Sequence, residues 1–401
     1  MKVLFLSAAN IYDIKQKNIY TDLIRKFISK NHFMYIVSPL ERRVNRKTSY
    51  VKGKNYELLQ VRTLNLQKTN IIEKGISTIS IGYLFKRGIK KYFGDVNFDL
   101  ILHSTPPITF TQVIKYYKAK YQPIVYLLLK DIFPQNAVDL GFFKKNTLIY
   151  KYFRFKEKQL YNISDYIGCM SVANAEFILA NNPYLNKKKV EVNPNSIELY
   201  GHYDGVSDTF PFFNKLKGKI VFVYGGNLGL PQGIDFLLNS ILYCKDLENV
   251  FFLIIGSGTE QKKINTWFDL HAPSNAILVN ELQKYQYDFV LQKCHVGLIF
   301  LHPDFTIPNY PSRILSYMEH KMPVICATDE VTDIGRNAEN GNYGYWCKSG
   351  DLEKFKKYVI MLSENRDLRI QRGNNAYNYL KHNVVVDVSY EIILKHFDYL
   401  H

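Results

Sequence analysis

Hydrophobic and polar positions follow two patterns that alternate along the whole chain. Short, almost continuously apolar runs, such as Lys2–Ser7 and Ile124–Leu129, are typical of strands buried on both faces of a sheet. Longer stretches between them, such as 16–30 and 144–163, repeat their apolar residues at helical spacing. The alternation therefore predicts an α/β fold in which doubly wound parallel sheets are covered by helices.

The predicted elements form two series that share an architecture but not a sequence. The strands expected in the first series are Lys2–Ser7, Phe33–Ser38, Leu58–Thr63, Leu100–Ser104, Ile124–Leu129, Tyr166–Met170 and Val190–Val192. The helices expected between them lie at 16–30, 70–92, 109–119, 144–163 and 174–182. The second series has strands at Lys219–Tyr224, Val250–Ile255, Ala276–Val279, His295–Leu301 and Pro323–Ala327, then helices near 351–363, 366–381 and 388–399.

A chain of 401 residues is too long for one ordinary core, so we expect two domains. The stretch from Pro194 to about Leu216 has weak periodicity and turn chemistry, and it marks the join. The first domain is then 1–195, the second is 217–385, and 386–401 is a C-terminal helix that returns to the first domain. Two such Rossmann-like domains facing each other leave a cleft lined by the carboxyl ends of their strands.

Composition and charge narrow the cellular setting. The five cysteines are dispersed and form no Cys-x-x-Cys motif, which indicates reduced thiols in the cytoplasm. The apolar run at the N-terminus is too short for the hydrophobic region of a signal peptide. No run of about 18 uncharged apolar residues occurs, so we expect no membrane-spanning helix. Residues 1–200 hold 32 Lys/Arg against 14 Asp/Glu, a net charge of +18, whereas the remainder has −2. This asymmetry favours a first domain that faces a polyanionic surface, either a membrane or a nucleic acid.

Glycines at the ends of the second-series strands are the strongest functional signal. Gly225-Gly226-Asn227, followed by Gln232 in the next turn, and Gly256-Ser257-Gly258 each separate a strand from a helix. Such ends bind phosphates in α/β sheets, and Arg313, early in a later helix, adds a cation suited to a diphosphate. The alternative for any one of these motifs is an ordinary tight turn between a strand and a helix.

These motifs resemble the retaining, two-domain (GT-B) glycosyltransferases of family 4, in particular bacterial capsule and O-antigen N-acetylfucosaminyltransferases. The resemblance spans nearly the whole chain and is carried by Tyr224–Gly229 with Gln232-Gly233, Ile255–Glu260, Pro311–Met318 with Pro323–Ile325, Ser104–Pro107 and Lys130–Pro134. It implies a GT-B architecture and a UDP-sugar donor on the second domain. The implied donor contacts are Gly225, Gly226, Asn227, Gln232, Gly256, Gly258, Glu281, Ser312, Arg313 and Ser316.

The chain departs from the family pattern at several of these positions. Asn227 and Gln232 stand where family members have an Arg and a Lys, which leaves Arg313 as the main phosphate cation. Pro308 and Ser316 replace a pair of glutamates, so Ser316 is a weaker ribose contact. Lys130 stands where a histidine often lies near the donor sugar.

Three residues of the first series are the catalytic candidates. Lys130-Asp131 follows a strongly apolar strand, and His103 lies near the end of another. Asp131 would orient or deprotonate the acceptor hydroxyl, and Lys130 would offset the charge of the departing diphosphate. The alternatives are a structural ion pair for Lys130-Asp131, a structural histidine at 103, and a surface carboxylate at Glu281.

The sequence thus predicts a metal-independent enzyme without a cofactor, since no Asp-x-Asp motif or zinc-ligand spacing occurs. The resemblance implies transfer to an undecaprenyl-diphosphate-linked saccharide at the inner face of the cell membrane. Segments 70–92 and 144–158 interleave basic and large apolar residues, as lipid-bound helices do, although helices packed on their own sheet show the same pattern.

Two alternatives remain open: a UDP-sugar epimerase, and a non-enzymatic nucleic-acid-binding protein. The latter lacks any recognised nucleic-acid motif.

Overall fold

The structure, a computed structural model, describes residues 1–66, 69–199 and 210–397. The chain divides into two compact units: unit 1 is Met1–Ile197 with Val386–His401, and unit 2 is Glu198–Val385. The predicted join includes residues 200–209, which lie outside the described residues.

Unit 1 is built on an eight-stranded sheet in the order β3-β4-β2-β1-β5-β6-β7-β8. The strands are β1 Lys2–Leu6, β2 Phe33–Glu41, β3 Ser49–Gly53, β4 Tyr56–Thr63, β5 Leu100–Ser104, β6 Ile124–Leu129, β7 Tyr166–Cys169 and β8 Val190–Val192. All neighbours pair in parallel except β3, which runs antiparallel to β4. The apolar pattern missed β3 because this short edge strand has no buried residue and carries no apolar run.

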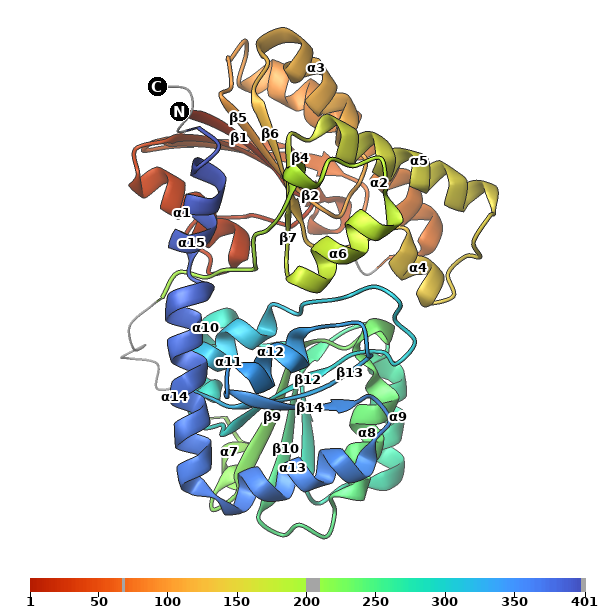
Figure 1. Ribbon diagram of the computed structural model, residues 1–401, viewed down its shortest axis with the longest axis vertical. Helices are drawn as coiled ribbons and strands as arrows, with labels where there is room; N and C mark the ends of the chain where they lie inside the picture. Colours follow the sequence, from red (N-terminus) through yellow and green to blue (C-terminus); the bar gives the residue numbers. More distant parts are fainter. Residues whose placement is uncertain (67–68, 200–209, 398–401) are drawn as a thin grey trace. The chain divides into compact units, whose positions relative to one another are not determined.

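Helices cover both faces of this sheet. They are α1 Ile19–Ser29, α2 Ile71–Tyr92, α3 Thr111–Tyr121, α4 Gln135–Asp139, α5 Leu148–Ile163, α6 Val172–Asn181 and α15 Val386–Leu394, with 3-10 turns at Arg42–Val44 and Lys187–Lys189. Helix α15 lies beside α1 (Figure 1), where Tyr390 Oη is 2.8 Å from His32 Nε2. Ser389 Oγ also donates to Asn193 Oδ1 at 2.7 Å, and Ile393 is fully buried, so α15 completes the core of unit 1.

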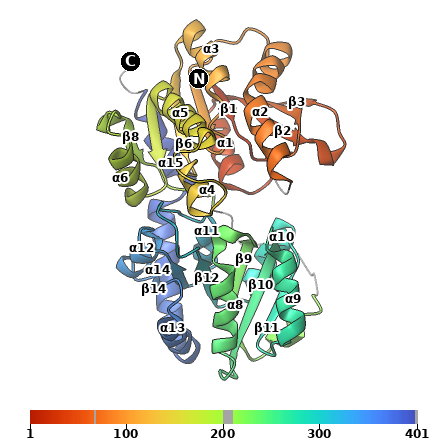
Figure 2. The same cartoon turned by 90° about the vertical axis from the view of Figure 1, so that its right-hand side faces the viewer.

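Unit 2 has a six-stranded parallel sheet in the order β11-β10-β9-β12-β13-β14. The strands are β9 Ile220–Asn227, β10 Val250–Ser257, β11 Ala276–Val279, β12 Val296–Phe300, β13 Val324–Thr328 and β14 Gly344–Lys348. The helices are α7 Phe213–Leu216, α8 Ile234–Tyr243, α9 Gln261–His271, α10 Lys284–Leu291, α11 Arg313–Glu319, α12 Ile334–Asn340, α13 Leu352–Glu364 and α14 Arg366–Asn383, with a 3-10 turn, η3, at Leu230–Gln232. Helices α8 and α9 lie side by side on one face (Figure 2), whereas α11 and α14 pack together on the other.

The strand order places a topological switch point in unit 2. From β9 the chain builds outward through β10 to β11, and it then crosses back to β12 on the other side of β9. The carboxyl ends of β9 and β12 therefore border the position where open α/β sheets bind ligands. The glycine motif ends β9, and the segment after β12 leads to Arg313.

Candidate functional site

The carboxyl end of β9 changes from buried to exposed within two residues. Tyr224 and Gly225 are buried, whereas Gly226 and Asn227 are exposed. The Gly225 N–H donates to the Tyr317 hydroxyl of α11 at 3.0 Å, so it is not available to a phosphate. The predicted donor contact of Gly225 therefore cannot use this amide, and the accessible edge begins at Gly226.

Arg313, the first residue of α11, reaches this edge from the other side of the switch point. Its Cζ lies 4.5 Å from the centre of the Tyr224 ring, and its Nη2 donates to Gln232 Oε1. A Cβ on Gly226 would make an ordinary contact with the Arg313 Cζ at 3.4 Å, and the φ of +133° at Gly226 is what favours glycine there. The two elements that the sequence singled out thus meet in space.

The guanidinium is incompletely satisfied. Its Nη1 is buried and makes no hydrogen bond of acceptable geometry to any described residue. Burial lowers the pKa of Arg313, but the nearby Tyr224 and Tyr317 outweigh that effect, and the net direction of the pKa is upward. A guanidinium with a buried N–H group that has no acceptor is the arrangement that an anionic ligand would complete.

Gln232 has a supporting position. Its side chain is buried in η3, and Oε1 accepts from Arg313 and lies 3.4 Å from the Tyr224 hydroxyl. Gln232 therefore holds the guanidinium in place, and its predicted contact with the donor stays a prediction. Asn227 is exposed at the strand end, where a ligand can reach it.

Gly256 and Gly258 serve close packing between chain segments. A Cβ on Gly256, which has φ +158°, would lie 1.9 Å from the Gly226 carbonyl oxygen. A Cβ on Gly258 would lie 2.2 Å from the Leu228 oxygen. These glycines let the ends of β9 and β10 lie against each other, which shapes the edge without requiring a ligand.

The remaining donor-side candidates lie after β11 and in or beside α11. Glu281, after β11, is exposed and accepts from Ser257 Oγ at 2.6 Å. Ser312 is exposed next to Arg313, and Ser316 lies in α11. Their proposed contacts with a nucleotide stay predictions.

In unit 1, Lys130 and Asp131 follow the carboxyl end of β6. The Asp131 carboxylate accepts from the Asn136 amide at 2.8 and 2.7 Å, and no ion pair joins it to Lys130 among the described residues. The geometry thus does not support a structural ion pair here. Burial raises the pKa of Asp131 to about 6 and lowers the pKa of Lys130 to about 7. Both groups can change protonation near neutral pH, as acid–base residues do.

His103 lies deeper than the sequence suggested. Its side chain is fully buried in β5, and its Nε2 is 3.2 Å from Ser164 Oγ. Burial lowers the pKa of this imidazole to about 3, so it is neutral. A structural role fits this placement better than contact with a substrate.

Two tyrosines that the sequence reading did not single out organise the site. Tyr224 supplies the ring under Arg313, and its hydroxyl donates to the Asn227 oxygen at 2.8 Å. Tyr317 binds the Gly225 amide. Tyr224 precedes the glycines directly, and Tyr317 follows Arg313 by one helical turn, which are the spacings that could have revealed them.

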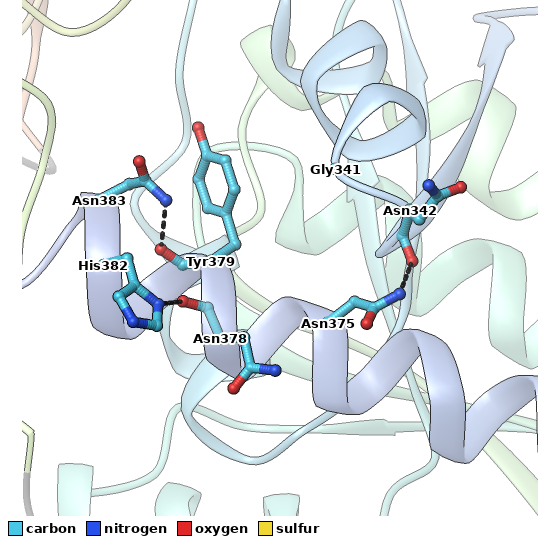
Figure 3. Close-up of a pocket in the computed structure, with 7 residues that line it drawn as sticks. All are labelled: Gly341, Asn342, Asn375, Asn378, Tyr379, His382 and Asn383. Carbon is cyan, nitrogen blue, oxygen red and sulfur yellow. Dashed lines mark hydrogen bonds between the residues drawn. The ribbon is translucent and has the colours of Figure 1, made fainter.

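A separate polar depression of about 390 Å³ lies between α14 and the turn after α12 (Figure 3). It is lined by Gly341, Asn342, Asn375, Asn378, Tyr379, His382 and Asn383. The Asn375 amide already donates to the Asn342 oxygen at 2.9 Å, and the Asn383 amide to the Tyr379 oxygen at 3.0 Å. None of the predicted donor contacts at the ends of β9 and β10 lines this depression.

Two doubly wound units, one with a guanidinium and glycines at its switch point, define the GT-B class. The E. coli structure "Trehalose-6-phosphate from E. coli bound with UDP-2-fluoro glucose" has this fold, with a TM-score of 0.75, 10% identity, and coverage of 99% of this chain and 98% of that one. Anabaena HepE in complex with UDP matches with a TM-score of 0.64 and 13% identity over 100% of both chains.

Sequence comparisons point to the same class of enzyme. Residues 206–379 match the family Glycosyl transferases group 1. The probable glycosyltransferase WbjE of Pseudomonas aeruginosa is 24% identical over 308 residues, which are 74% of each protein. Unit 2 is thus similar to the glycosyl transferases of group 1, and the protein is a glycosyltransferase.

Proposed function

We propose that this glycosyltransferase moves a sugar from a UDP-sugar to a polyprenyl-diphosphate-linked saccharide, with retention at the anomeric carbon. The product would serve capsule or O-antigen biosynthesis. An N-acetylated deoxyhexose is the sugar proposed, and UDP-N-acetyl-L-fucosamine is the first donor to test.

The observation that carries the donor part is the buried, unsatisfied Nη1 of Arg313 beside the exposed Gly226. A diphosphate at this edge would accept from that nitrogen and meet the positive charge at the switch point. The structures of Anabaena HepE, solved with UDP and with UDP-glucose, support a uridine nucleotide as the donor carrier. The GT-B fold of HepE is shared here over the full chain.

The proposed reaction exchanges one bond at the anomeric carbon. The bond from C1 to the diphosphate oxygen breaks, and the bond from C1 to the acceptor hydroxyl oxygen forms on the same face. UDP leaves with the electron pair, and Arg313 stabilises its growing negative charge. Asp131 takes up or orients the hydroxyl proton, and protonated Lys130 adds positive charge. We propose that no metal ion or cofactor takes part.

The acceptor part is supported by charge. The excess of basic residues lies in 1–200, which favours an anionic lipid-linked acceptor and an anionic bilayer at the inner face of the cell membrane. No helix in the described ranges is long and apolar enough to cross a membrane. The epimerase alternative gains no structural support, and a glycosyltransferase domain disfavours the nucleic-acid-binding alternative.

The direct test incubates the enzyme with single UDP-sugars, with and without a lipid-linked saccharide. We expect a longer saccharide and stoichiometric UDP only when both substrates are present, and NMR of the new linkage should show the donor's anomeric configuration. Free UDP with an epimerised sugar, formed from donor alone, would contradict transfer. Thermal-shift screening with UDP and GDP tests the base separately, because a bound nucleotide stabilises the folded state.

A further inference from the structure

Helix α5 exposes a stripe of large apolar side chains on the face opposite the one it buries. Leu148 is 85% exposed and Phe155 56%, and Tyr152 lies among them; Ile149, which is nearer to the buried face, is 50% exposed. The buried residues of α5 are Phe153, Glu157, Leu160 and Tyr161. At about 100° per residue, Leu148, Tyr152 and Phe155 fall within a sector of about 60° that points away from the buried ones.

Lysines border this stripe on both sides. Lys151 and Lys158 lie along one flank and Lys156 along the other, where its Nζ is 5.5 Å from the centre of the Tyr152 ring. Just before the helix, Phe142, Lys144 and Lys145 are exposed as well. Segment 142–163 contains six basic residues and a single acidic one, Glu157, which pairs with Arg154 and is buried.

We propose that the α5 stripe, defined as Phe142, Leu148, Ile149, Tyr152 and Phe155 with its flanking lysines, inserts into the interface of an anionic phospholipid bilayer. A helix that lies in the membrane plane needs apolar side chains on its lower face and cations beside them at headgroup level. A second copy of this chain is a poor occupant, because two such faces would bring together two segments that each carry a net charge of +5.

The structure also distinguishes the segments 70–92 and 144–158, which the sequence analysis had identified equally as candidate lipid-binding helices. Helix α2 exposes Ile76, Ile79 and Tyr83 in its first half, where Lys74 is its one basic residue. Its other basic residues follow in the second half, at Lys86, Arg87, Lys90 and Lys91. Most of the basic groups of α2 are thus separated from its exposed apolar groups, whereas the two kinds are interleaved along α5. We therefore place the main lipid contact on α5. The membrane role rests on the proposed function, but the contact surface is tested independently.

The test is co-sedimentation of the full-length protein with vesicles of phosphatidylcholine alone or mixed with phosphatidylglycerol. We expect binding to the mixed vesicles, and we expect Leu148→Ser/Ile149→Ser to weaken it at least about tenfold. The matched control is Leu270→Ser/Ile370→Ser in unit 2, whose side chains are similarly exposed, at 76% and 50%. This control should bind as wild type does.

The contribution of the flanking lysines to vesicle binding is tested with the double variant Lys151→Gln/Lys158→Gln. Each lysine near an anionic surface contributes about fivefold to binding, which corresponds to about 1 kcal/mol. The double variant should therefore bind about 25-fold more weakly at low salt, and wild-type binding should fall as salt is added. A Phe155→Trp variant should shift its emission to the blue on mixed vesicles, beyond the signal of the two native tryptophans, and brominated lipid should quench it.

Four outcomes would overturn the inference. The first two are unchanged vesicle binding of the Leu148→Ser/Ile149→Ser variant and an equal loss of binding in the unit 2 control. The third is a loss of binding only in an Ile76→Ser/Ile79→Ser variant of α2. The fourth is that the Leu148→Ser/Ile149→Ser variant changes in oligomeric mass without a change in vesicle binding. UDP affinity is measured for every protein. If UDP binds and vesicles do not, the lipid inference fails alone; if vesicles bind and UDP does not, the donor assignment fails instead.

Discussion

Replacement of Arg313 by alanine separates a ligand-binding role from a structural one. In the free protein the variant loses the contact with the Tyr224 ring, worth about 0.5–1 kcal/mol, and the charge-assisted hydrogen bond to Gln232, worth about 1.5–3 kcal/mol. It also removes a buried donor without a partner, whose cost is about 1–3 kcal/mol. These contributions offset each other in part, so the free energy of unfolding should fall by about 1 kcal/mol.

The nucleotide-bound state should respond quite differently. Hydrogen bonds to a charged group contribute about 1.5–3 kcal/mol, so losing the guanidinium should cost about 2–4 kcal/mol of UDP binding. At about 1.4 kcal/mol for each factor of ten, the Kd should rise about 30- to 700-fold. Arg313→Lys keeps the charge but loses the fork geometry, and its Kd should lie between those of wild type and Arg313→Ala.

The chain offers a matched control in Arg372. Its Cζ lies 4.1 Å from the centre of the Tyr345 ring, its Nη1 donates to the Gly344 oxygen at 3.1 Å, and its Nε is buried without a partner. Arg372 therefore resembles Arg313 in its tyrosine contact and its buried nitrogen without a partner, but it belongs to α14 and lies away from Gly226. Isothermal titration with UDP should give a wild-type Kd for Arg372→Ala. Equal Kd values for Arg313→Ala and wild type, or equal losses in both alanine variants, would refute the phosphate role.

Four further outcomes follow from the structure. If the Asp131 anion and the Lys130 cation are both needed, kcat should fall below about pH 6 and above about pH 7, and a flat profile over that range would exclude these two groups. The raised pKa of Asp131 means that its ionised form opposes folding, so Asp131→Asn should gain stability over wild type as the pH rises from about 4 to about 6, by up to about 3 kcal/mol in urea unfolding. Gly256→Ala puts a Cβ 1.9 Å from the Gly226 oxygen and should cost about 3 kcal/mol or more, and a wild-type melting temperature would contradict that packing. Tyr317→Phe leaves a buried amide of β9 unpaired and should lower stability by about 1–3 kcal/mol in the same unfolding assay.

Much of the architecture was readable from the sequence because buried parallel strands leave continuous apolar runs. Strand β3 was missed for the opposite reason: it lies at a sheet edge, its residues are partly or fully exposed, and it carries no such run. The fold class is confirmed by the solved structures with the same GT-B fold. The edge strands β8 and β11 were found because apolar residues make up most of each, so an apolar run decides whether a strand is predicted.

The candidate site was only partly predictable. Glycines at the end of β9 and Arg313 could be found because strand ends and helix starts are local features. That Tyr317 takes the Gly225 amide, and that Gly256 packs against Gly226, depends on contacts between residues far apart in the chain. His103 shows the same limit, since a histidine near a strand end can lie inside the core or on its rim, and only the packed structure distinguishes the two.

Because α15 supplies part of the core of unit 1, that unit is assembled from two stretches of chain separated by all of unit 2. During synthesis on the ribosome, unit 2 emerges whole while the α1 side of unit 1 still lacks Tyr390 and Ile393. The nascent first unit therefore carries an uncovered apolar surface until α15 leaves the exit tunnel, and we expect it to need chaperone protection during that time.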